Sequence, residues 1–175
     1  MYCINKEWGM NRKLPFDISE NKKIRLIIKT DAKNEADDQF AIVHALLTPR
    51  FKIKGIVAAN YSNGAAMFNR TENSMQASYD EIEKLLTIMN LNGHVPVYKG
   101  AEKPISDETT PERSEGAETI ICEALADDPT PLYVVFLGPL TDLASAYLME
   151  PKIADKLTDG SVDWREAMAK GRLGV

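Results

Sequence analysis

Short apolar runs rich in β-branched residues alternate along the chain with longer segments in which apolar residues recur every three or four positions. Runs of the first kind indicate buried strands, and segments of the second kind indicate helices. The predicted strands lie at residues 24–28, 54–60, 95–98 and 131–137. The predicted helices lie at residues 37–47, 69–89, 115–126 and 140–148. This alternation predicts an α/β fold, with a mostly parallel sheet and helices on both faces.

Two of the predicted helices differ in their expected surroundings. Residues 40–47 are apolar on nearly all sides and stop before Pro49, so we expect a buried helix with His44 in the core. Residues 69–89 carry apolar side chains at helical spacing with charged side chains between them. That segment is therefore predicted to be a helix with one face in solvent.

Composition limits both the size of the fold and its partners. The chain has 175 residues, of which 44% are hydrophobic and 27% charged, enough for one compact domain with a core. Its 21 basic and 26 acidic residues give a formal net charge of -5, so no basic field exists to attract a phosphate backbone. Nucleic acid is not an expected partner.

The ends of the chain and its cysteines suggest a location. Residues 1–21 are polar and lack the apolar core of a signal peptide, and no apolar run approaches the roughly 20 residues that span a bilayer. Cys3 and Cys122 match no disulfide framework, so we expect free thiols. These features favour a cytoplasmic protein with no membrane partner. We divide the chain into a polar lead (1–21), an α/β domain (22–157) and a divergent C-terminal tail (158–175).

The loop after the first predicted strand is strongly acidic. It places Asp31, Glu35, Asp37 and Asp38 within eight residues at a strand-to-helix turn, where open α/β sheets bind their ligands. Like charges packed so closely favour a hard divalent cation, and calcium takes about six to eight oxygen ligands. The alternative is structural: Asp37 and Asp38 would cap the helix, and Asp31 would end the strand.

Four stretches of the chain, which together cover residues 24–157, resemble one known family in the same order. Thr30 and Asp31, then five residues, then Asp-Asp-Gln-Phe-Ala-Ile-Val-His-Ala-Leu-Leu-Thr-Pro resemble the N-terminal signature of the inosine-uridine preferring nucleoside hydrolases. Residues 55–60 are similar to the family's second strand, and residues 95–101 to its P-V-x-x-G turn. Residues 135–144, followed by 150–153, resemble its G-x-L-T-N-[LI]-A…P-x-[IL] motif. The resemblance implies a Rossmann-like nucleoside hydrolase core that is incomplete.

This resemblance implies calcium-dependent hydrolysis of the N-glycosidic bond of ribonucleosides. By the same resemblance, Asp31 would be both a calcium ligand and the general base, and Asp38 the main bidentate ligand. Asp37 would hold a ribose hydroxyl and approach the metal, and Leu137 would bind calcium through its backbone carbonyl. The ribose-contacting asparagine of the family corresponds to Asn60 or Asn63; Asn60 directly follows the apolar run, and either assignment requires a small shift.

Three departures from the family pattern bear on activity. Lys29 stands where the family usually has an aspartate two positions before Asp31. Two extra residues lengthen the loop between Asp31 and Asp37, so that Glu35 becomes an alternative ligand. The family is nearly twice as long, and its later ribose-binding, base-contacting and calcium-binding residues have no counterpart here.

Two other interpretations remain open. One is a catalytically inactive remnant or assembly module of the same fold, in which an exposed sheet edge pairs with another chain, including a second copy in a homo-oligomer. The other is a phosphotransferase with an aspartyl nucleophile. It ranks last, because Lys33 stands where a second acidic residue would follow Asp31.

Overall fold

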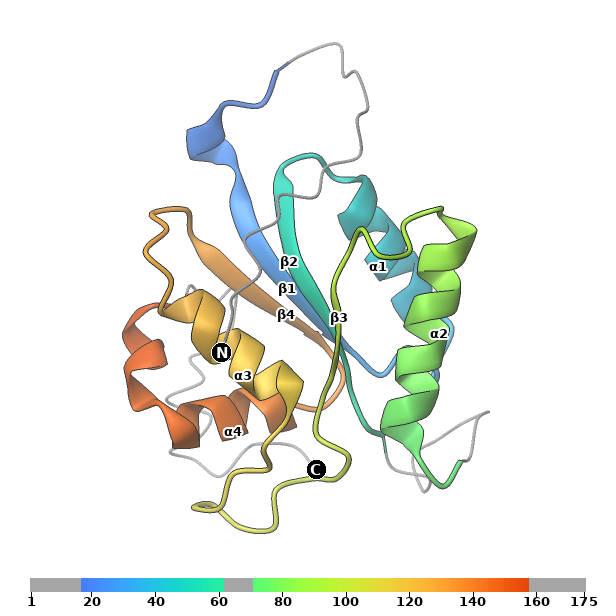
Figure 1. Cartoon of the computed structure of the whole chain (residues 1–175), viewed down its shortest axis with the longest axis vertical. Helices are drawn as coiled ribbons and strands as arrows, with labels where there is room; N and C mark the ends of the chain where they lie inside the picture. Colours follow the sequence, from blue (N-terminus) through green and yellow to red (C-terminus); the bar gives the residue numbers. More distant parts are fainter. Residues whose placement is uncertain (1–16, 62–70, 158–175) are drawn as a thin grey trace.

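A four-stranded parallel sheet with two helices on either side forms the body of the protein (Figure 1). The computed structural model describes residues 17–61 and 71–157. The strands are β1 (Ile24–Thr30), β2 (Phe51–Ala58), β3 (Val97–Lys99) and β4 (Leu132–Leu137). The helices are α1 (Asp38–Leu47), α2 (Ser74–Ile88), α3 (Glu115–Ala124) and α4 (Thr141–Met149), with 3-10 turns at η1 (Glu20–Lys22) and η2 (Pro151–Asp155). The predicted α/β class and the alternation of strands and helices are confirmed.

The strand order β3-β2-β1-β4 creates a switch point beside β1. From β1 the chain moves outward to β2 and then β3, whereas β4 returns to pair with the other side of β1. Thr30 pairs with Leu137 at the carboxyl ends of β1 and β4. Crevices at such reversals are where open α/β sheets bind ligands, so topology alone directs attention to these two strand ends.

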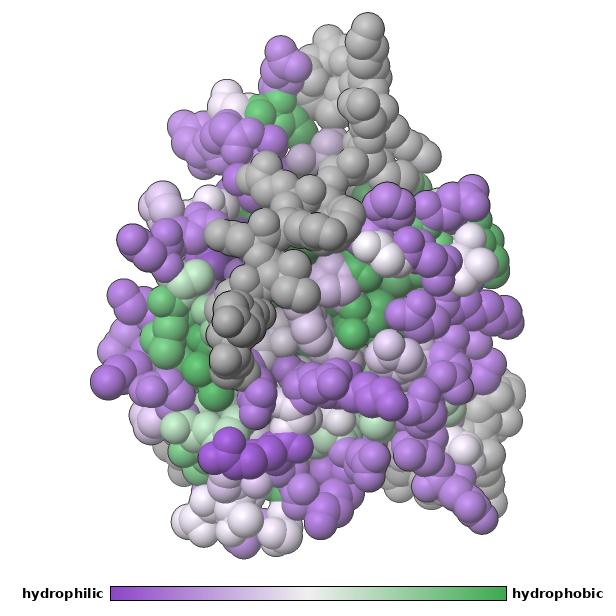
Figure 2. All heavy atoms as spheres, viewed as in Figure 1, coloured by the Kyte–Doolittle hydropathy of each residue, from purple (hydrophilic) through white to green (hydrophobic). Residues whose placement is uncertain are grey.

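Side chains alternate along β1 between two cores. Leu26 and Ile28 belong to a core that α1 and α2 cover, and Ile27 belongs to a core that α3 and α4 cover. Both faces of β1 are therefore buried, which explains why it reads as a nearly continuous apolar run, whereas β4 is only partly buried and its Val135 is 41% exposed. Figure 2 shows hydrophilic residues over most of one face of the molecule, including the outer side of α2, as predicted for that helix.

Polar side chains fix the starts of α2 and α3. The Asn73 side chain accepts a hydrogen bond from the backbone N–H of Gln76 (2.9 Å), and Ser114 accepts one from the N–H of Ala117 (3.0 Å). Each cap satisfies an N–H group that the helix leaves without an internal partner. Helix α2 therefore begins at Ser74, later than the predicted start at residue 69, which lies outside the described residues.

The sequence prediction that α1 is buried on nearly all sides is wrong. Helix α1 buries a single stripe made of Asp38, Ile42 and Ala45, whereas Phe40 is 77% exposed and His44 is also exposed. An apolar residue on a helix need not be buried, because packing against the sheet covers only one side.

Cys122 is disulfide-bonded, so the prediction of a free thiol is wrong. The cysteines therefore no longer support a cytoplasmic location.

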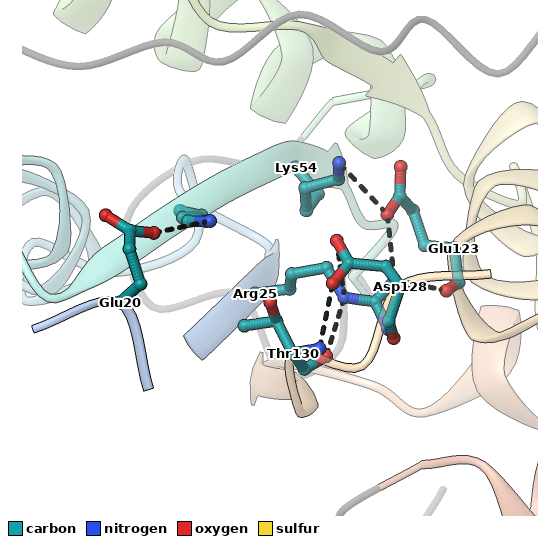
Figure 3. Close-up of polar contacts among 7 residues, drawn as sticks. Glu20, Arg25, Lys54, Glu123, Asp128 and Thr130 are labelled. Carbon is teal, nitrogen blue, oxygen red and sulfur yellow. Dashed lines mark hydrogen bonds and ion pairs between the residues drawn. The ribbon is translucent and has the colours of Figure 1, made fainter. Parts of the chain in front are cut away.

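The amino-terminal end of the sheet is held by a buried arginine (Figure 3). Arg25 donates hydrogen bonds to the backbone carbonyls of Thr130 (2.9 Å) and Glu123 (2.6 Å), and it forms an ion pair with the Glu123 carboxylate (3.3 Å). Lys54 contacts the same carboxylate at 3.4 Å. These bonds fasten the end of α3 to β1 and β2.

Within the described ranges, no helix is long and apolar enough to cross a membrane.

Candidate functional site

The carboxyl ends of β1 and β4 bring Asp31 against the turn that follows Leu137. The backbone N–H of Asp31 donates a long hydrogen bond to the carbonyl of Leu137 (3.4 Å). Gly138 leaves room for the carboxylate, because a Cβ atom at this position would lie 2.7 Å from Asp31 Oδ1. Two of the residues that the sequence singled out therefore meet at the switch point, and a glycine makes the close approach feasible.

Burial perturbs the carboxyl group of Asp31. The residue is only 9% exposed, and this burial raises its pKa because the charged form loses contact with water. A hydrogen bond from Asn34 Nδ2 to Asp31 Oδ2 (3.2 Å) and the charge of Lys29 act in the opposite direction. The N–H of Asn34 also donates to the carbonyl of Asp31 (2.7 Å), so a tight turn directs the loop back towards the sheet.

This turn lets Asp38 lie beside Asp31. Asp38 opens α1, is 7% exposed, and accepts a hydrogen bond from Thr30 Oγ1 (2.7 Å). Burial raises the pKa of Asp38 to about 6, and the charge of Asp31 adds to the increase. The two carboxyl groups lie close enough to interact directly. Two adjacent buried carboxylates without a cation cost free energy, which a bound cation would recover.

The oxygen donors at this edge fit a hard cation in kind but fall short in number. Asp31, Asp38 and the carbonyl of Leu137 offer oxygen atoms, as calcium prefers. Asp37 and Glu35 are exposed, and the described part of the chain contains no group of three His, Cys, Asp or Glu side chains that could hold a metal ion. The roles of Asp37 and Glu35 as ligands stay predictions, and a calcium ion here would need further oxygen atoms.

Asn60 lies at the same edge of the sheet and has an unused hydrogen-bond donor. It follows β2, is 5% exposed, and its Nδ2 atom has no hydrogen-bond partner among the described residues. The N–H of Ala59 donates to the carbonyl of Thr30 (2.8 Å), which keeps this loop against the end of β1. A buried amide without an acceptor is costly unless a ligand or water supplies one. Asn63, the other candidate from the sequence, lies outside the described residues.

Several supporting residues were not anticipated from the sequence. Thr30 and Asn34 orient the two carboxyl groups, and Gly138 makes space for Asp31. In the sequence, Lys29 is a departure from the family motif, and its side chain is expected either near the site or pointing outward. Its side chain is fully buried on the side of the sheet that α3 and α4 cover, where it forms an ion pair with Asp142, and its charge also acts on Asp31. The available signal was a lysine within an otherwise apolar strand.

Substituting Gly138 with alanine should displace the Asp31 carboxylate while leaving the fold intact. The new Cβ would approach Asp31 Oδ1 to within 2.7 Å, a clash that the side chain can relieve only by moving. We expect a loss of calcium-induced stabilisation, with a change of less than about 1 kcal/mol in the free energy of unfolding without calcium. Thermal unfolding with and without calcium measures both quantities, and an unchanged calcium response would contradict this geometry.

Replacing Asp38 with asparagine should stabilise the calcium-free protein at neutral pH. The folded pKa of about 6 exceeds the ordinary value of 3.8, so between these values the folded state keeps a proton that the unfolded chain has lost. Stability therefore falls as pH rises through this window, and the full penalty, on the order of 3 kcal/mol, applies above pH 6. Melting temperatures of chelator-treated protein should show a gain at pH 7.5 that vanishes towards pH 4; a gain independent of pH would exclude this cause.

Comparison of the chain with protein-family profiles identifies its family. The sequence profile described as "Inosine-uridine preferring nucleoside hydrolase" matches residues 26–162. The chain belongs to this family. The match contains both buried aspartates and Leu137, so the switch-point site lies in the part of the chain that the nucleoside hydrolase family shares. No curated protein sequence matches the chain at a significant level.

Solved nucleoside hydrolase structures have a similar fold. An "Inosine-Guanosine Nucleoside Hydrolase (IG-NH)" is 26% identical with a TM-score of 0.57, and the alignment covers 77% of this chain and 44% of that one. A purine-preferring ribonucleoside hydrolase from Gardnerella vaginalis is 23% identical with a TM-score of 0.57, with coverage of 76% and 46%. A plant nucleoside hydrolase, PpNRh1, is 22% identical with a TM-score of 0.58, with coverage of 77% and 45%. The chain thus spans less than half the length of these structures.

Proposed function

We propose that this nucleoside hydrolase family member binds calcium at the Asp31–Asp38 edge and hydrolyses the N-glycosidic bond of ribonucleosides, releasing base and ribose. The observation that carries the proposal is the pair of adjacent buried carboxyl groups at the switch point of the sheet. Family membership supports the reaction class, and the raised pKa of Asp38 supports a demand for positive charge at this position. We place the reaction in the cytoplasm.

In this proposal the buried aspartates have separate roles. Asp31, held by Asn34 and the Leu137 carbonyl, takes a proton from the attacking water, and its burial makes the ionised form a stronger base than an exposed aspartate. Asp31 would also bind the cation, together with Asp38, which Thr30 orients, and the Leu137 carbonyl. Calcium, when bound, would grip the ribose hydroxyls and lower the pKa of the water.

One asparagine side chain and one aspartate side chain would contact the sugar. Asn60 would donate a hydrogen bond from its unused Nδ2–H group to a ribose oxygen, which would satisfy the buried amide. Asp37, exposed at the start of α1, would accept a hydrogen bond from a ribose hydroxyl. Asn63 is retained as an alternative to Asn60. These contacts would position the anomeric carbon, where positive charge develops as the bond to the base breaks.

A second candidate is an inactive module of the same fold. It is favoured by the donor set of only two buried carboxylates, because the described part of the chain contains no group of three such side chains that could hold a metal ion. Such a module would lack much of the stabilisation that the transition state requires. It would act through association, with a free sheet edge pairing with another chain or with a second copy.

Hydrolysis and assembly can be measured on the same preparation. Inosine, guanosine and uridine are incubated with the protein, and released ribose is quantified with calcium or after chelator treatment, while size-exclusion chromatography with light scattering gives the molecular mass. Calcium-dependent ribose release supports the enzyme. A protein that releases no ribose from any of the three nucleosides in calcium contradicts it and favours the inactive module.

A further inference from the structure

A buried ion pair joins two positions at which this chain differs from the family pattern. Lys29 replaces the aspartate usual two positions before Asp31, and Asp142 stands at the asparagine of the motif G-x-L-T-N-[LI]-A. The two residues are 113 positions apart, yet Lys29 Nζ lies 3.1 Å from Asp142 Oδ2, and both residues are fully buried. Two departures that contact each other indicate a paired replacement rather than two independent changes.

The contacts of Lys29 connect both strands that build the candidate site. Its backbone lies in β1, two residues before Asp31, and its ammonium group donates a hydrogen bond to the carbonyl of Pro139. Pro139 is in the turn after β4, directly beyond Leu137 and Gly138. Lys29 therefore ties the end of β1 to the turn that carries the proposed calcium-binding carbonyl.

The contacts of Asp142 extend this connection to two more segments. Asp142 Oδ1 accepts hydrogen bonds from the N–H of Ala101 (2.8 Å) and from Ser114 Oγ (2.5 Å), which also caps α3. Gly100 packs so closely that a Cβ at this position would lie 2.8 Å from Asp142 Oδ2. A single carboxylate thus holds the chain after β3, the start of α3 and the start of α4 against the end of β1.

We propose that Lys29 and Asp142 are paired positioning residues that hold the Asp31 and Leu137 segments in register at the carboxyl edge of the sheet. The proposal rests on the proposed function only in treating this edge as a site. Because the cationic and anionic partners are buried together, removing either one leaves the other without compensation, and the segments that they join should loosen. The aspartate and asparagine of the family pattern should be able to replace them only as a pair.

The test is hydrogen exchange of single amides in the calcium-free protein, measured by NMR for four variants. Lys29→Asp and Asp142→Asn each break the pair, and the double variant that combines these two substitutions installs the family pattern. Glu123→Gln is the matched control, because it breaks the buried ion pair with Arg25 at the opposite end of the sheet. Asp142→Asn preserves the shape of the side chain, so it carries the test if Lys29→Asp does not fold.

The informative amides are those of Asp31, bonded to Leu137, and Ala101, bonded to Asp142. The Ile56 amide, bonded to Pro96, serves as an internal reference. We expect each single variant to raise exchange of Asp31 and Ala101 about tenfold or more over Ile56, and the double variant to reverse most of this increase. Glu123→Gln should leave these ratios unchanged.

Three results would overturn the pairing: unchanged exchange ratios in the single variants, the same pattern in Glu123→Gln, or a double variant in which the two effects add. Calcium affinity of the same variants provides a second readout, since a purely structural pair would lower the melting temperature without weakening calcium binding. Hydrogen exchange is read without calcium or substrate. A parent protein that neither binds calcium nor releases ribose would therefore contradict the proposed function and leave the exchange result to decide the pairing.

Discussion

Changing Asp31 to asparagine should reduce ribonucleoside hydrolysis by about a thousandfold, because the amide cannot accept the proton of the attacking water. The substitution keeps the size of the side chain, and the backbone bond from residue 31 to Leu137 does not involve the carboxylate. The loss should therefore appear in kcat, with a smaller change in KM, since the proton is transferred only as the reaction proceeds. Initial rates of ribose release over a range of inosine concentrations separate the two parameters.

A matched substitution separates this effect from a general loss of charge. Asp127 is an exposed aspartate in the connection between α3 and β4, at the amino-terminal end of the sheet. Asp127→Asn removes the same charge far from the site and should leave kcat within about twofold of the parent, as expected of a surface substitution. If Asp31→Asn retained most of the parent's kcat, Asp31 would not be the general base.

Calcium should raise the melting temperature of the parent protein, and Asp38→Ala should abolish that increase. At a calcium concentration about one hundred times the dissociation constant, binding adds about 2.7 kcal/mol of stability, which corresponds to about 5–10 °C for a domain of this size. Asp38 lies within the buried carboxyl pair and its pKa is raised to about 6, so its removal takes away a principal source of negative charge. Differential scanning calorimetry with and without calcium measures the shift.

Asp37→Ala provides the neighbouring control for this prediction. Asp37 is exposed at the start of α1, and its side chain makes no capping hydrogen bond to the helix. Because it lies outside the buried pair, its loss should reduce the calcium shift by less than half. A calcium shift that survived Asp38→Ala and disappeared with Asp37→Ala would place the cation on the outer side of the loop.

The strands and the position of the site were predictable because the relevant signals are local. Continuous apolar runs such as residues 24–28, which are buried in β1, are typical of covered parallel strands, and polar residues that follow such strands gather at one edge. Because Asp31 and Asp38 follow the first strand in the sequence, they were predictable at this edge, and the structure places both there as buried side chains. The calcium and ribose roles remain predictions.

Features that depend on contacts between distant segments were not predictable. The composition of α1 indicated burial, but the packing leaves Phe40 77% exposed. The partner of Lys29 is Asp142, on a helix that begins more than one hundred residues later, and no periodicity in either segment encodes that contact. The raised pKa of Asp38 likewise requires both its burial and the proximity of Asp31, which only the folded chain provides.

A crystal structure of the protein grown with calcium and an unreactive ribonucleoside analogue tests the central claim most directly. We predict one calcium ion at the carboxyl ends of β1 and β4, with oxygen atoms of Asp31, Asp38 and the Leu137 carbonyl at about 2.3–2.6 Å. The ribose hydroxyls should complete the shell, and the Nδ2 atom of Asn60 should contact a ribose oxygen. Electron density without an ion at this edge, or an ion bound by other residues while Asp31 and Asp38 remain in contact only with each other, would contradict the account.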